Sequence, residues 1–106
     1  LGYRKQAESK VEQDKLIKKA IEIEKTGCFS LVLEHVPSLV ANKLSNLLKI
    51  PVIGIGAGEN CDGQIRVTAD LLGLTEKQPP FAKPLINLRE QSITTLKNWV
   101  QSTKTN

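Results

Sequence analysis

Residues 28–58 read CFSLVLEHVPSLVANKLSNLLKIPVIGIGAG, and this stretch decides the fold. Its first part, residues 28–36, is short, apolar and rich in strand formers, which predicts a buried strand. A helix is predicted next, to about Lys49, because apolar residues recur on one side at helical spacing. Residues 50–56 then form a continuous apolar run of the kind found in parallel sheets covered on both faces. Strand, helix and strand in this order predict a right-handed βαβ unit.

The segment before this unit carries the signals of a helix. Ser9 and Glu12 match a capping box, in which each side chain satisfies a backbone amide of the other residue. Apolar residues recur at helical spacing after them, and Gly27 stands where a left-handed C-cap is needed. We therefore expect a helix over residues 9–26.

The segment after the unit is less regular. Residues 64–70 predict a short third strand, whereas three prolines interrupt any helix in residues 71–84. A capping signal at Asn87 then predicts a final helix to about Ser102. The residues expected on its apolar face are Ile93, Leu96, Trp99 and Val100.

The predicted elements give an α/β fold that does not close on itself. Three strands and three helices, beginning with a helix, leave apolar strands without neighbours to cover them. The chain also contains no methionine and begins with Leu1. Both observations predict a fragment or a processed chain.

Composition excludes several classes of protein. The 106 residues are 40% hydrophobic and 25% charged, as in folded soluble proteins, and no apolar run approaches the roughly 20 residues of a membrane helix. The net charge of +4 arises at the two ends of the chain, and only four aromatic residues are available to stack on bases, so a nucleic-acid partner is disfavoured. The start of the chain lacks the apolar core of a secretory signal, which predicts a cytoplasmic location. Cys28 and Cys61 are expected to be reduced structural thiols.

Glu34 is the first candidate for chemistry. It ends an otherwise apolar strand just before a proline, at the rim where parallel sheets and barrels keep their active sites. Burial against leucine and valine side chains is expected there, a setting in which a carboxylate acts as a general base. A carboxylate that caps the following helix is an equally good interpretation.

The remaining polar candidates have simpler interpretations. His35 is the only histidine, and strand alternation would send it to the face opposite Glu34, as a packed or surface residue. The glycines of residues 54–63 follow a strand, but both nucleotide-binding signatures fail, so a tight turn with close backbone approach is favoured over a phosphate cradle. Asp62 and Asp70 are interpreted as turn formers, and neither is assigned to a metal.

Three segments together resemble the family of ketopantoate hydroxymethyltransferases, also called 3-methyl-2-oxobutanoate hydroxymethyltransferases. They are residues 31–37 (LVLEHVP), 50–58 (IPVIGIGAG) and 61–64 (CDGQ). The similarity begins at the Gly2–Tyr3 pair and extends to Lys83, so it covers most of the chain. Two departures are visible: Leu1 and Ala7 stand in place of glycines, and His35 stands where a smaller residue is common.

The resemblance implies a TIM (β/α)8 barrel of the phosphoenolpyruvate mutase-like superfamily. Residues 1–106 would then be the C-terminal part of a single barrel domain, from about the fifth helix to the last, with no separate domains. The sixth, seventh and eighth strands would be residues 28–34, 51–57 and 64–69.

The resemblance also implies a reaction. The family transfers a hydroxymethyl group from methylenetetrahydrofolate to 3-methyl-2-oxobutanoate (ketoisovalerate) and forms 2-dehydropantoate (ketopantoate), in pantothenate and coenzyme A biosynthesis. Glu34 matches its proposed proton acceptor. Mg²⁺ is the implied cofactor, but the family's ligands for it lie in the N-terminal half, so no metal ligand or folate-contacting residue is assigned here and the chain alone is expected to be inactive. A keto acid, folate and further copies of the chain are the expected partners, with no nucleic acid and no membrane.

Two other classes of function remain open. One is a non-catalytic half-barrel that serves as a binding or assembly module. The other, and the weaker, is a basic nucleic-acid binder.

Overall fold

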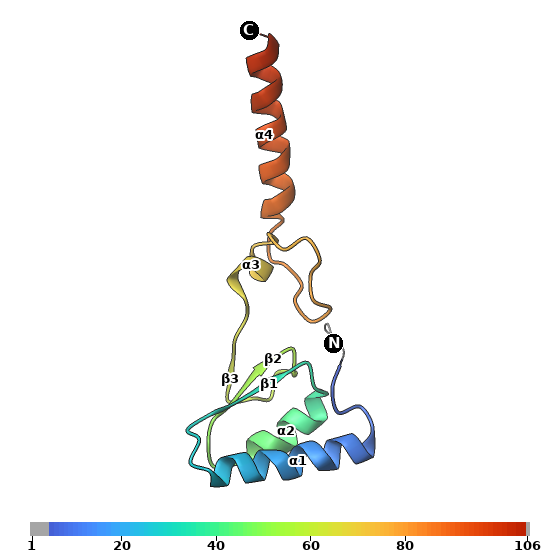
Figure 1. The fold of residues 1–106 in the computed structure, drawn as a ribbon, viewed down its shortest axis with the longest axis vertical. Coiled ribbons are helices and arrows are strands. Elements are labelled where there is room, and N and C mark those ends of the chain that lie inside the picture. Colours follow the sequence, from blue (N-terminus) through green and yellow to red (C-terminus); the bar gives the residue numbers. More distant parts are fainter. Residues whose placement is uncertain (1–4, 106) are drawn as a thin grey trace. The chain divides into compact units, whose positions relative to one another are not determined.

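A three-stranded parallel sheet organises the first part of the chain. In the computed structural model, which describes residues 5–105, its strands are β1 (Leu31–Glu34), β2 (Val52–Ile55) and β3 (Gly63–Gln64), in the order β1-β2-β3 (Figure 1). Leu31 pairs with Val52, and Ile53 with Gly63. The predicted α/β class with a parallel sheet is thus confirmed.

The chain divides into two compact units, the first ending at Ile65 and the second beginning at Arg66. The Gly2–Tyr3 pair lies outside the described residues.

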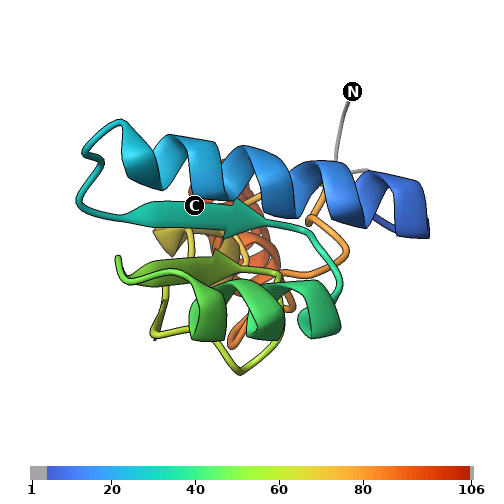
Figure 2. The ribbon, with the colours of Figure 1, turned by 90° about the horizontal axis from the view of Figure 1, so that it is seen from below.

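Two helices cover one face of this sheet. These are α1 (Lys10–Lys25) and α2 (Ser38–Leu47), which lie side by side over β1 and β2 (Figure 2). Between helices and sheet lies an apolar core, in which Val40, Leu44 and Val52 are fully buried. The strand–helix–strand order predicted for residues 28–56 is confirmed, although both strands are shorter than the apolar runs that predicted them.

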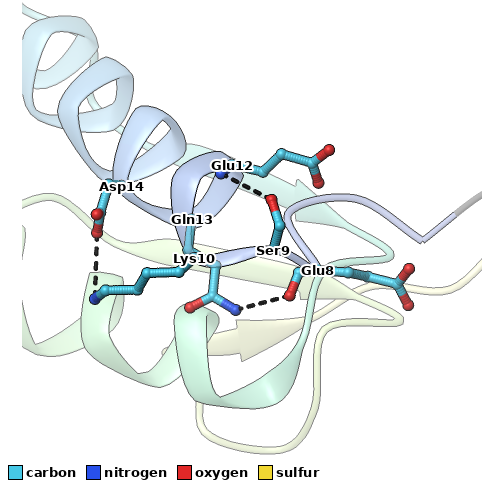
Figure 3. Close-up of polar contacts among 6 residues, drawn as sticks. All are labelled: Glu8, Ser9, Lys10, Glu12, Gln13 and Asp14. Carbon is cyan, nitrogen blue, oxygen red and sulfur yellow. Dashed lines mark hydrogen bonds and ion pairs between the residues drawn. The ribbon is translucent and has the colours of Figure 1, made fainter.

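The start of α1 follows the predicted cap. Ser9 adopts extended backbone angles, and its hydroxyl oxygen accepts a hydrogen bond from the backbone N–H of Glu12 at 3.2 Å (Figure 3). A surface ion pair between Lys10 and Asp14, at 3.4 Å, spans the first turn. The helix ends at Lys25, and Gly27 follows with φ of 93°, as a left-handed cap requires.

The end of α1 is also tied to the segment that leads into β2. The Glu24 carboxylate accepts hydrogen bonds from the backbone N–H groups of Lys49 and Ile50, the latter at 3.1 Å. These amides lie just beyond α2, where no helical partner is available to them. One acidic side chain therefore joins both helices to the strand that follows them.

The predicted third strand, residues 64–70, is found only in small part. Gly63 and Gln64 pair as strand β3 at the end of the first unit, and the second unit forms the short helix α3 (Thr68–Leu71) where strand was expected. The buried Asp70 explains the difference, because its carboxylate accepts a hydrogen bond from the Thr75 hydroxyl at 2.6 Å and its carbonyl oxygen accepts one from Gln78. These contacts outweigh the weak strand preference of the segment.

The second unit ends with the long helix α4 (Leu88–Thr105). Its predicted cap is present, since the Asn87 side-chain oxygen accepts a hydrogen bond from the Glu90 amide at 3.4 Å. The helix continues past the predicted end at Ser102. Leu96 and Trp99 are 61% and 65% exposed, so the predicted apolar face is solvent-accessible in this chain. Within residues 5–105, no helix has the length and apolar character needed to cross a membrane.

Candidate active site

The residue predicted for the site, Glu34, lies at the carboxyl edge of the sheet. Glu34 is the last residue of β1 and pairs with Ile55, the last residue of β2. The loops that follow both strands therefore begin side by side. Parallel sheets bind their ligands at this edge, which makes it the candidate site.

Glu34 belongs to the sheet face that the helices leave open. Leu33 is 4% exposed and packs in the core, whereas Val32 is 54% exposed and Glu34 is also exposed. Because side chains alternate along a strand, Val32 and Glu34 share the face opposite α1 and α2. The expected burial of Glu34 against leucine and valine is not found: Leu33 faces the core, Val32 is itself exposed, and Glu34 is exposed in this chain.

The helix-capping interpretation of Glu34 finds no support. The residue at the N-cap of α2 is Pro37, which forms no side-chain cap hydrogen bond. Within residues 5–105, no hydrogen bond joins the Glu34 carboxylate to the first turn of α2. The expected alternative, a cap formed by Glu34, is therefore not observed.

The chain turns sharply directly after Glu34. His35 has φ of 53°, a left-handed conformation that is uncommon for a residue with a side chain. Its N–H donates to the carbonyl oxygen of Ile55 at 2.9 Å, and its own carbonyl oxygen accepts from the N–H of Gln6 at 2.8 Å. Strand alternation, on which the sequence-based placement of His35 depends, ends at Glu34. No sequence signal marks this conformation.

The glycine-rich loop after β2 packs closely, as predicted. Gly58, with φ of 83°, lies against the start of α2: a Cβ built on it would overlap the Cβ of Ser38 and lie 3.0 Å from its Cα. Gly54 is similarly close to the side chain of Cys61. The Gln64 side chain donates to the Gly58 carbonyl oxygen at 2.9 Å and holds the loop in this position. The close-approach interpretation of these glycines is confirmed.

The two aspartates have structural roles. The Asp62 carboxylate accepts from the N–H of Val52 at 2.8 Å, while the Asp62 N–H donates to the Val52 carbonyl oxygen at 2.9 Å. Asp62 thereby forms two hydrogen bonds to the first residue of β2, and Asp70 forms hydrogen bonds to the turn after α3. Across residues 5–105 no three His, Cys, Asp or Glu side chains gather to form a metal site. Both cysteines are free, Cys28 exposed and Cys61 half-buried.

Comparison with known proteins gives one consistent family. The sequence model of the family described as ketopantoate hydroxymethyltransferase matches residues 1–106. A curated protein of Prochlorococcus marinus (strain SARG), named 3-methyl-2-oxobutanoate hydroxymethyltransferase, is 67% identical over 100 residues, which are 94% of this chain and 39% of that protein. A protein of the same name from Synechococcus sp. (strain CC9902) is 61% identical over 101 residues, which are 95% of this chain and 37% of that protein. The chain thus spans about two-fifths of the length of these relatives.

Proposed function

Because the chain belongs to the ketopantoate hydroxymethyltransferase family, we propose that it supplies the proton acceptor of an enzyme that converts 3-methyl-2-oxobutanoate to ketopantoate. The observation that supports this role for Glu34 is its place at the carboxyl edge, on the sheet face that α1 and α2 leave open. A substrate can reach the carboxylate from that side. Methylenetetrahydrofolate is the proposed source of the one-carbon unit.

The reaction requires a base that removes a proton from the carbon beside the ketone of the keto acid. The Glu34 carboxylate removes the proton from the carbon beside the ketone, and the electron pair of that C–H bond forms the enolate. The enolate carbon then bonds to the one-carbon unit, whose bonds to the folate nitrogens break. Water supplies the hydroxyl oxygen, and tetrahydrofolate leaves.

Magnesium, which the resemblance implies, does not fit the residues of this chain. In the described part of the sequence, Asp62 and Asp70 are committed to hydrogen bonds of the protein, and no acidic cluster accompanies Glu34. Ligands for magnesium would have to come from residues other than those described.

A barrel is the proposed setting of the sheet. The three strands are parallel and follow one another in chain order, and the helices cover one face only, as in three consecutive strands of a TIM barrel. The open face with Val32 and Glu34 would then line the barrel interior. We also propose a homo-oligomer, since α4 exposes Leu96 and Trp99.

The proposed function is tested in a chimeric enzyme. In it, this chain replaces the segment that it matches in the Prochlorococcus marinus (strain SARG) relative. The measurement is exchange of the proton beside the ketone of 3-methyl-2-oxobutanoate for deuterium from D₂O, without folate. Glu34→Gln should lower the exchange rate by about 100-fold to 10,000-fold, the usual contribution of a positioned base.

A matched control comes from the same edge of the sheet. Glu59 is an exposed acid in the loop after β2, and Glu59→Gln should leave exchange unchanged. Normal exchange in a folded Glu34→Gln chimera would show that another group is the base. A folded chimera that exchanges no proton at all would favour the assembly-module interpretation of this chain.

A further inference from the structure

Two residues near Glu34 have a left-handed backbone conformation. Ala7 and His35, with φ of 54° and 53°, are the non-glycine residues of positive φ within residues 5–105. They belong to segments far apart in the sequence, which the hydrogen bond from the Gln6 N–H to the His35 carbonyl oxygen joins at 2.8 Å. Such conformations are costly, and they persist where the surrounding structure holds them, often at functional sites.

The surroundings of His35 hold its backbone from both sides. Its N–H, bonded to the Ile55 carbonyl oxygen, belongs to the peptide plane that joins Glu34 to His35. That bond therefore fixes the backbone on the carboxyl side of Glu34. The Gln6 N–H fixes the next peptide plane in the same way. The left-handed φ between the two planes turns the chain away from the sheet directly after the carboxylate.

We propose that His35 is a positioning residue, whose left-handed backbone conformation, held by Ile55 and Gln6, orients the Glu34 carboxylate for proton removal. The backbone carries this role, and the imidazole ring is dispensable to it. The inference rests on the proposed function of Glu34. It adds that the residue type at position 35 is limited by its tolerance of positive φ.

A series of substitutions separates the backbone from the ring. Glycine adopts positive φ freely, asparagine tolerates it, alanine tolerates it poorly, and valine is the least compatible because of its branched side chain. In the chimera, His35→Gly and His35→Asn should retain most of the deuterium exchange rate. His35→Val should lower the rate by about tenfold to 100-fold, the effect of a misplaced catalytic group, with little change in the KM for the keto acid. His35→Ala should fall between, which keeps the order measurable if the valine variant does not fold.

The structure offers a control with positive φ away from the site. Gly27 has φ of 93° at the opposite, amino end of β1, and a Cβ built on it meets no atom within 4 Å. Gly27→Val therefore imposes backbone strain at a position where the added Cβ meets no neighbour. It should lower the melting temperature as His35→Val does and leave exchange unchanged.

The outcomes distinguish this inference from the proposed function. If the unsubstituted chimera exchanges protons and Glu34→Gln does not, the base is established. Full exchange in His35→Val would then overturn the positioning role alone. Equal losses in His35→Gly, His35→Asn and His35→Val would also overturn it, because the ring itself would be required.

Discussion

The contact between Gly58 and Ser38 allows a quantitative test of how the edge of the sheet is built. Gly58→Ala adds a methyl group that overlaps the Cβ of Ser38, and it does so at a φ of 83°. The positive φ costs about 1–2 kcal/mol for a residue with a Cβ. Overlap in a packed site adds about 1–3 kcal/mol. The free energy of unfolding should fall by about 2–5 kcal/mol in total.

Gly27→Ala isolates the conformational part of this cost. Gly27 has a similar φ of 93°, but open space surrounds its Cβ position, so only the first penalty applies. Thermal unfolding of the two chimeric variants gives the comparison. Gly58→Ala should melt at least about 2 °C below Gly27→Ala, because about 1 kcal/mol shifts the melting temperature by about 2–4 °C in a protein of roughly 150–250 residues, which is close to the length of the chimera.

Ser38→Gly closes the thermodynamic cycle. It removes the Cβ that the new methyl group would meet, although the Ser38 Cα would remain 3.0 Å away. The double variant should therefore recover most of the overlap cost, a coupling of about 1–3 kcal/mol. Equal melting temperatures for Gly58→Ala and Gly27→Ala, with no coupling to Ser38→Gly, would refute the close packing of the loop after β2 against the start of α2.

Two further predictions concern stability. Asp62→Ala removes the acceptor of the Val52 N–H and should cost about 1–3 kcal/mol, whereas Glu59→Ala, an exposed acid in the same loop, should have little effect on the melting temperature. Equal losses of melting temperature in the two variants would contradict a stabilising role of the Asp62 hydrogen bonds to Val52. Ala7→Gly should stabilise the chimera by up to about 1 kcal/mol, since φ at this position is 54°. A lower melting temperature in this variant would show that the buried methyl group outweighs the strain.

Short sequence patterns correctly predicted the helix ends, because contacts between neighbouring residues determine them. The cap at Ser9, the cap at Asn87 and the left-handed Gly27 each depend on residues within a few positions, and the structure shows all three. Strands β1 and β2 were found from their apolar runs. Their ends were predicted less well, because pairing with a neighbour decides where a strand stops.

Features that depend on particular side-chain contacts were not predicted from the sequence. The helix α3 stands where strand was predicted because the buried Asp70 bonds to Thr75 and Gln78, five and eight residues further along the chain, and no capping or turn pattern includes these pairs. The turn at His35 depends in the same way on Ile55 and Gln6. The place of Glu34 on the strand was predicted correctly, but its accessibility was not, since that depends on which face the helices cover.

One face of β1 packs into the core and the other is open, and this difference has an evolutionary consequence. Leu33 contributes to the core, whereas its neighbours Val32 and Glu34 contribute nothing to it. A substitution at position 32 changes the open face of the sheet without opening a cavity between sheet and helices. Selection can therefore act on the open face and on fold stability at adjacent positions of one strand almost independently. Position 32 can vary while Leu33 stays constant.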